Sequence, residues 1–90
     1  MNKRATLKVD GHVQGVFYRV WAKRQAEDLE LCGIARNDPD GSVSIEVEGD
    51  DQGIQEFIDR CWDGPELARV KNIQVEWVEY EGSYSSFFIQ

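Results

Sequence analysis

The sequence has no apolar run that approaches the roughly 20 residues needed to cross a bilayer. Its basic start, residues 1–10, is followed by no apolar core of the kind that signal peptides contain. Low-complexity segments and linkers rich in proline or glycine are also missing. These absences argue against a membrane-bound protein. They predict a single domain over residues 1–90, in the cytoplasm and without a membrane partner.

Cysteine and histidine are scarce as well. The two cysteines, Cys32 and Cys61, lie far apart and form no Cys-x-x-Cys motif, and His12 is the single histidine. Because the acidic residues are scattered, no set of ligands for a metal ion stands out. We therefore expect no metal, no cofactor and two free thiols, as is usual in a reducing compartment.

The charge is negative overall but unevenly distributed. Ten Lys and Arg stand against 17 Asp and Glu, and the net charge of −7 argues against a broad basic surface for nucleic acid. Residues 1–37 nevertheless carry a balance of +3, whereas residues 38–90 carry −10. A bound anion is therefore expected to meet the first part of the chain, and no nucleic-acid partner is expected.

Hydrophobic spacing gives the order of the secondary structure. Alternation predicts strands over residues 5–11, 34–37, 43–49 and 73–77, and a last strand carries Phe87 and Ile89. Helices are predicted over residues 18–29 and from Asp50 or Asp51 to Gly64. The order is βαββαβ with a short extra C-terminal edge strand. It predicts an α+β, ferredoxin-like split sandwich, in which two helices cover one face of an antiparallel sheet.

This topology relates residues that are distant in the sequence. Because a crossover helix returns the chain, the first two strands run in the same direction, and Arg19 and Asn37 lie at one edge of the sheet. The helices run antiparallel, so Cys32 and Cys61 lie at opposite edges, which argues against a disulfide between them. The second helix carries an apolar stripe: Ile54, Phe57, Ile58, Cys61 and Trp62.

The segment between the first strand and the first helix is the candidate binding site. A helix start leaves backbone N–H groups without intrahelical partners, and Gly11 and Gly15 let such groups turn toward one anion. No acidic residue follows Asp10 in the loop, and the planar guanidinium of Arg19 fits two phosphate oxygens. The loop is neither a Walker nor a Rossmann motif. Taken alone, an arginine such as Arg19 is more often a solvated helix-start residue than a ligand, and an asparagine such as Asn37 is more often a turn former.

Two blocks of the sequence resemble the signatures of the acylphosphatase family. Residues 11–19, GHVQGVFYR, resemble Gly-x-Val-Gln-Gly-Val-x-Phe-Arg, and residues 33–43 are similar to the second block with its Asn-x-x-Asp-Gly-x-Val. The resemblance spans nearly the whole chain. Three positions depart from the family pattern: Tyr18 replaces Phe, Ile34 replaces an aromatic residue, and Glu30 replaces a glycine. The Tyr18 hydroxyl then needs a partner or access to solvent, and a positive φ at Glu30 would cost roughly 1 kcal/mol.

The resemblance implies an enzyme that hydrolyses the carboxyl-phosphate bond of acyl phosphates to a carboxylate and inorganic phosphate. Two side chains are implied as catalytic, Arg19 for the phosphoryl oxygens and Asn37 for the attacking water. Backbone amides of the loop would complete the phosphate site: those of Gly15, Val16, Phe17 and Tyr18. The implied chemistry involves no metal or cofactor. The expected partners are a small acyl phosphate and inorganic phosphate, as product and competitive inhibitor, and the expected state is a monomer.

Other functional classes fit the sequence less well. RNA-binding domains of this fold carry basic charge and paired aromatic residues on their central strands, and this chain has neither. A closer alternative is a non-catalytic acylphosphatase-like module, or one that handles carbamoyl phosphate within a longer maturation protein. A chain of 90 residues favours the free-standing enzyme over such a module.

Overall fold

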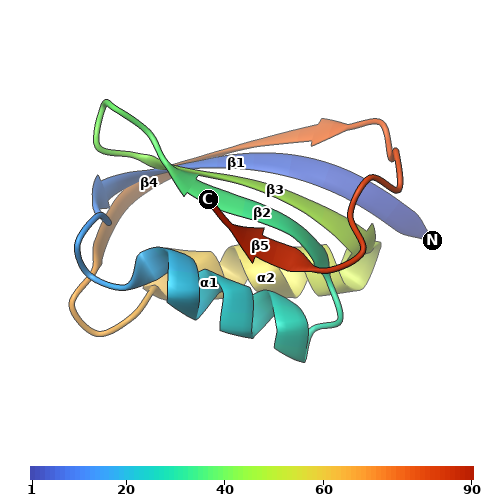
Figure 1. The fold of residues 1–90 in the computed structure, drawn as a ribbon, viewed down its shortest axis with the longest axis horizontal. Helices are drawn as coiled ribbons and strands as arrows, with labels where there is room; N and C mark the ends of the chain where they lie inside the picture. The colour runs from blue at the N-terminus through green and yellow to red at the C-terminus, as the bar shows by residue number, and fades with distance from the viewer.

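The computed structural model describes residues 1–90 and has the predicted order of elements (Figure 1). These are β1 (Asn2–His12), α1 (Tyr18–Asp28), β2 (Cys32–Asn37), β3 (Val43–Asp50), α2 (Asp51–Asp63), β4 (Arg69–Val78) and β5 (Phe87–Ile89). β1 and β4 are longer than predicted because they pair with each other beyond the residues whose side chains alternate, and because Asn2 and Lys3 of β1 pair with β3. Neither helix has the length and the apolar character of a membrane span.

The strands form one sheet in the order β4-β1-β3-β2-β5. β1 runs antiparallel to β3 and β4, and β3 runs antiparallel to β2, so β1 and β2 point the same way as predicted. β5 departs from the expected antiparallel sheet, because it pairs parallel to β2, with Gly33 opposite Phe87. β4 runs opposite to β2. Because the chain reverses direction after β4, β5 runs in the direction of β2. The sheet is mixed, and only β1 to β4 are antiparallel.

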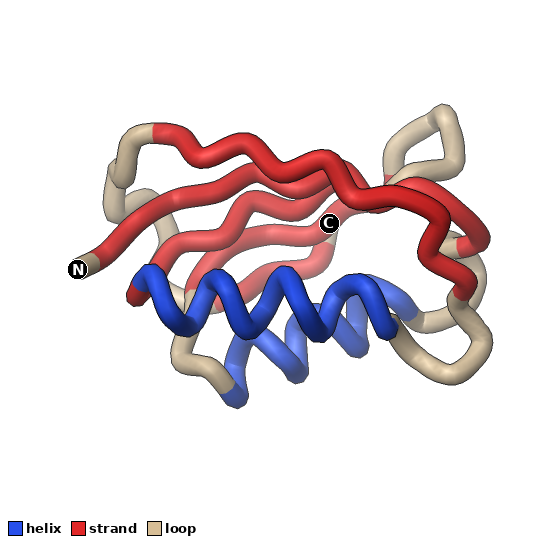
Figure 2. The backbone as a smooth tube through the Cα atoms, turned by 180° about the vertical axis from the view of Figure 1, so that it is seen from behind, coloured by secondary structure: helices blue, strands red, loops and turns tan.

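Both helices pack on one face of the sheet, and the other face is free of helices (Figures 1 and 2). α1 lies against β2 and β5, whereas α2 lies against β1, β3 and β4. Burial of Phe57 between α2 and the sheet contributes about 1.5–3 kcal/mol. The prediction that Trp62 belongs to the apolar stripe of α2 is wrong, since this residue is 45% exposed. The buried stripe of α2 is therefore narrower than the sequence indicates and consists of Ile54, Phe57 and Cys61.

α1 ends in a left-handed turn. Glu30 has φ 58°, and its backbone N–H donates to the Glu27 carbonyl at 3.0 Å. The Leu31 N–H donates to the Ala26 carbonyl at 2.8 Å, which satisfies a second carbonyl of the last helical turn. Glu30 thus occupies the backbone conformation for which the sequence predicts a cost of roughly 1 kcal/mol.

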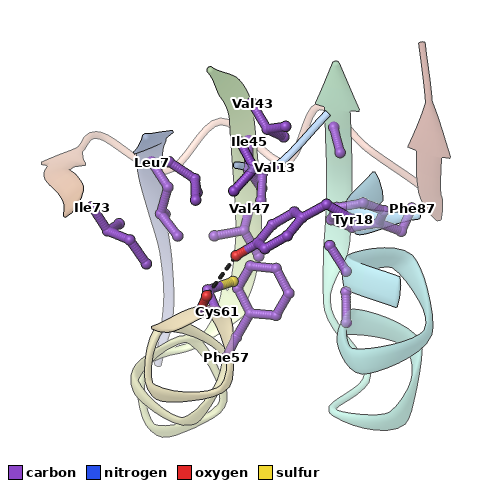
Figure 3. Packing of buried hydrophobic residues seen from close by; sticks show 14 of the residues in the cluster. Leu7, Val13, Tyr18, Val43, Ile45, Val47, Phe57, Cys61, Ile73 and Phe87 are labelled. Atoms are coloured by element: carbon purple, nitrogen blue, oxygen red, sulfur yellow. Dashed lines mark hydrogen bonds between the residues drawn. The ribbon is translucent and has the colours of Figure 1, made fainter. Parts of the chain in front are cut away.

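α2 is held at both ends by side-chain hydrogen bonds. The Asp50 carboxylate caps the N-terminus, accepting a hydrogen bond from the Gln52 N–H at 3.1 Å. At the C-terminus, Pro65 has no N–H to donate to the Cys61 carbonyl. The Tyr18 hydroxyl donates to that carbonyl at 2.6 Å (Figure 3). Burial raises the pKa of Tyr18 far above its ordinary value, so the hydroxyl stays protonated and remains a donor. The first residue of α1 is thereby fixed to the last turn of α2.

Glu48 holds the segment between β4 and β5. Its side chain is 3% exposed and accepts hydrogen bonds from Arg4 at 3.0 Å and from the backbone N–H groups of Glu81, Gly82 and Ser83 at 3.2, 3.0 and 2.9 Å. Burial by itself raises the pKa of Glu48, but these donors outweigh it and lower the pKa. The buried, ionised carboxylate therefore fixes the path of residues 81–83, which lead to β5 at the edge of the sheet beside α1.

Replacement of Tyr18 by phenylalanine tests the link between the helices. Tyr18→Phe keeps the ring but leaves the buried Cys61 carbonyl without a donor, and we expect the free energy of unfolding to fall by about 1–3 kcal/mol. Urea unfolding followed by circular dichroism measures the change. Tyr80→Phe serves as the control, because Tyr80 is 45% exposed. Equal stability of the two variants would contradict the capping role of the hydroxyl.

Candidate active site

The loop between β1 and α1 adopts left-handed backbone conformations at two residues. Gly15 has φ 73°, and a Cβ added there would meet no atom within 4 Å, so conformation and not space requires the glycine. Phe17, the N-cap of α1, has φ 66°, which costs roughly 1–2 kcal/mol for a residue with a side chain. Strain of this kind in a loop that opens a helix is typical of functional sites.

The backbone N–H groups of residues 15–18 have no hydrogen-bond partner within the chain. The N-terminus of α1 has no side-chain cap and no acidic residue in its first turn. Alternating left- and right-handed conformations at a helix start turn such amides into a concave donor site, to which the helix dipole adds positive potential. The arrangement is suited to holding a small anion.

Arg19 lies in the first turn of α1 and is already restrained by the end of the chain. Its Nη1 donates to the carbonyl oxygen of Gln90 at 2.7 Å. The Gln90 N–H in turn donates to the Ala35 carbonyl of β2 at 2.9 Å. β5 therefore positions the guanidinium, which retains further N–H donors for a ligand.

Asn37 is the last residue of β2, and it shares one cavity with Arg19. The cavity has a volume of about 250 Å³ and is lined by Val13, Gly15, Phe17, Tyr18, Arg19, Val20 and Asn37. The parallel directions of β1 and β2 bring Arg19 and Asn37 to one edge, as the topology predicts. Among the predicted site residues, Val16 does not line the cavity, because its side chain is buried in the core.

Gln14 joins this loop to the turn that follows Asn37. Its Nε2 donates to the carbonyl oxygens of Asp38 at 2.8 Å and Ser42 at 2.9 Å. The turn is itself stiffened by the Asp38 carboxylate, which accepts hydrogen bonds from the hydroxyls of Ser42 and Ser44. The bond from Ser44 is the main cause of the lowered pKa of Asp38, although burial opposes it. An ionised Asp38 therefore keeps the turn in place.

Sequence reasoning missed four contributors to this site. Val13 and Val20 line the cavity, and their apolar character gave no signal that distinguished them from core residues. Gln14 was read only as part of a motif, although a glutamine between glycines is a candidate for bridging backbone carbonyls. The carbonyl of Gln90 lies 71 residues from Arg19 in the sequence, and no sequence pattern relates the two residues.

Two other features of the surface stand apart from this cavity. A larger groove of about 510 Å³ is lined by mixed charges and contains none of the predicted site residues: its polar lining includes Thr6, Lys8, Ser44, Glu46, Gln74 and Glu76. No group of three or more His, Cys, Asp or Glu side chains is placed to hold a metal ion. Cys32 and Cys61 are both free thiols, and burial raises the pKa of Cys61 to about 12.

Unpartnered amides and an arginine at a helix start, on a ferredoxin-like α+β domain, have the chemistry that suits an anion-binding site. Comparison with known proteins agrees with this fold and with a site for an anion, and it identifies the family. The family model described as Acylphosphatase matches residues 5–89. An acylphosphatase of Pelotomaculum thermopropionicum is 43% identical over 86 residues, which cover 96% of this chain and 94% of the relative.

Solved structures give the same result. The structure of an acylphosphatase from Coxiella burnetii matches with a TM-score of 0.94 and 32% identity, over 99% of this chain and 93% of that one. Full-length HypF, in a phosphate- and nucleotide-bound form, matches with a TM-score of 0.88 and 30% identity, over 100% of this chain but 12% of that one. The chain belongs to the acylphosphatase family, and it is accordingly an enzyme that hydrolyses acyl phosphates.

Removal of the Gln14 side chain tests whether the bridge sets the geometry of the site. In Gln14→Ala both carbonyls keep their backbone partners, so we expect the free energy of unfolding to fall by only about 1–2 kcal/mol. Turnover of acetyl phosphate should fall further than this loss of stability explains, because the loop and the Asn37 turn can then shift independently. Gln55→Ala, on the exposed face of α2, is the control. If Gln14→Ala turns over substrate as fast as the control, the bridge is only structural.

Proposed function

We propose that the cavity between the loop and β2 is the catalytic centre for acyl phosphate hydrolysis. Arg19 and the backbone amides of Gly15, Val16, Phe17 and Tyr18 hold the phosphoryl oxygens, and Asn37 holds the attacking water. The observation that carries this proposal is the run of unpartnered amides at residues 15–18, beside an arginine that shares its cavity with Asn37. Inorganic phosphate, the product, occupies the same site and is a competitive inhibitor.

The reaction needs no general acid from the protein, because the leaving group is a weakly basic carboxylate. The water oxygen forms a bond to phosphorus while the bond from phosphorus to the acyl oxygen breaks, and the carboxylate leaves with the electron pair. Charge on the equatorial phosphoryl oxygens is stabilised by Arg19 and the amides, which are oriented before the substrate binds. A phosphoryl oxygen of the substrate takes the proton from the water.

Asn37 acts by orientation alone. Its carboxamide does not titrate, so it cannot serve as a general base, but its oxygen accepts a hydrogen bond from water. A water held in line with the leaving carboxylate gains the rate advantage of a preoriented reactant. The Gln14 bridge supports this role, since it fixes the turn directly after Asn37.

The likeness to HypF favours a second candidate function. In it, the domain handles carbamoyl phosphate or binds phosphate without catalysis, as a module of a larger assembly. Incubation of the purified chain with benzoyl phosphate in the presence of EDTA separates the two candidates. Hydrolysis in EDTA supports the free-standing, metal-independent enzyme, whereas phosphate binding without hydrolysis of either benzoyl or carbamoyl phosphate supports the non-catalytic module.

Arg19→Ala tests the phosphate site. We expect loss of both turnover and inhibition by inorganic phosphate, because the site keeps the loop amides but loses its only permanent positive charge. Arg24→Ala, on the exposed surface of the same helix, is the matched control. Circular dichroism verifies that both variants fold. Near-normal turnover by Arg19→Ala would contradict the scheme.

Asn37→Ala tests the position of the water. We expect kcat to fall by about 10²-fold or more, while the affinity for inorganic phosphate stays close to that of the unsubstituted enzyme. Steady-state kinetics gives kcat, and titration calorimetry gives the affinity. Asn72→Ala, an exposed asparagine of β4, is the control. A parallel collapse of phosphate affinity would make Asn37 a ligand of the phosphoryl group instead of a holder of water.

A further inference from the structure

Phe17 combines two features that are unfavourable in a free surface residue. Its backbone is left-handed, with φ 66°, and its side chain is 73% exposed. Glycine or asparagine would adopt this conformation more easily and would expose no apolar ring. The turn itself does not require the ring, which lies in the lining of the candidate active site.

Val20 provides a second exposed apolar surface at the same cavity. It lies in the first turn of α1, and its side chain borders the same cavity as that of Phe17. Its side chain is 42% exposed and also lines the cavity. The other apolar lining residues, Val13 and Tyr18, are about 1% exposed and close the wall from behind.

The cavity offers an acyl group no polar side chain that the proposed mechanism leaves free, because Asn37 is assigned to the attacking water. The Tyr18 hydroxyl is already bound to the Cys61 carbonyl. Arg19 is the only charged residue in the lining, and the proposed mechanism assigns it to the phosphoryl group. A carboxylate or amide on the acyl side would lose its hydration without gaining a hydrogen bond, whereas a hydrocarbon group would lose contact with water at no such cost.

We propose that Phe17 and Val20 form a subsite for the acyl group, and that the preferred substrates are acyl phosphates with an uncharged hydrocarbon group such as a phenyl ring. The proposal rests on the proposed function, because it takes the phosphoryl group to be held at Arg19 and the loop. The cavity volume of about 250 Å³ is small beside the range typical of drug-sized ligands, which suits an acyl group of one ring or a short branched chain.

The test compares kcat/KM for benzoyl, acetyl and carbamoyl phosphate. The unsubstituted enzyme is expected to prefer benzoyl phosphate to the other two. Phe17→Asn removes the ring and keeps a residue that tolerates the left-handed conformation, and Val20→Thr keeps the shape and adds a hydroxyl. We expect the ratio of benzoyl to acetyl phosphate to fall by about 10-fold in Phe17→Asn and by a smaller factor in Val20→Thr.

Two matched variants control for changes in exposed apolar residues elsewhere. Phe88→Asn on β5 and Val78→Thr on β4 alter side chains that are 47% and 36% exposed and do not line the cavity. Both are expected to keep the substrate ratio of the unsubstituted enzyme. An unchanged ratio in Phe17→Asn and Val20→Thr would overturn the subsite. If Phe17→Asn fails to fold, Val20→Thr alone decides.

A binding measurement separates failure of the subsite from failure of the proposed function. Calorimetry gives the affinities for benzylphosphonate and methylphosphonate, in which a phosphorus–carbon bond replaces the phosphorus–oxygen bond that is hydrolysed. Tighter binding of benzylphosphonate, lost in Phe17→Asn, supports the subsite even if no substrate is turned over. Equal affinities overturn the subsite and leave phosphate binding and hydrolysis at Arg19 unaffected.

Discussion

The two hydrogen bonds donated by the Gln14 side chain are the constraint on which the site depends. They join the β1–α1 loop to two carbonyls of the turn at residues 38–42, which come from a different part of the sequence. Both donors belong to one planar carboxamide, so the loop and the turn can move only together. Because Arg19 lies in the first turn of α1 on one side of this bridge and Asn37 ends β2 on the other, the bridge restrains the two elements that carry them.

The strain in the loop is balanced by the packing of the residue that follows it. Phe17 is held in a left-handed conformation, and directly after it the buried ring of Tyr18 enters the core and its hydroxyl ends α2. A loop without such an anchor would relax its backbone and allow its amides to turn away from a common centre. The hydroxyl that departs from the family pattern therefore strengthens the support of the loop and leaves its backbone role intact.

The sequence allowed the strands, the helices and the pairing of Arg19 with Asn37 to be predicted, because each follows from periodicity or from the handedness of the βαβ unit. It could not predict the parallel pairing of β5, since a three-residue strand carries too little pattern to indicate its neighbour. The exposure of Trp62 was missed because helical spacing does not show how wide a face the sheet covers. Contacts such as Gln14 with the 38–42 turn depend on tertiary geometry alone. The monomeric state and the cytoplasmic location stay predictions from the sequence.

A net charge of −7 is compatible with an anion site, because distance and geometry outweigh the total charge. At physiological salt the Debye length is about 8 Å, so exposed carboxylates farther away than this are largely screened. The amides of residues 15–18 and the Arg19 guanidinium act at hydrogen-bond distance, where screening is weak. Asp38, the acidic residue next to Asn37, directs its carboxylate to Ser42 and Ser44 and is thereby occupied within the turn. The local arrangement of donors, and not the overall charge, therefore decides what this surface can bind.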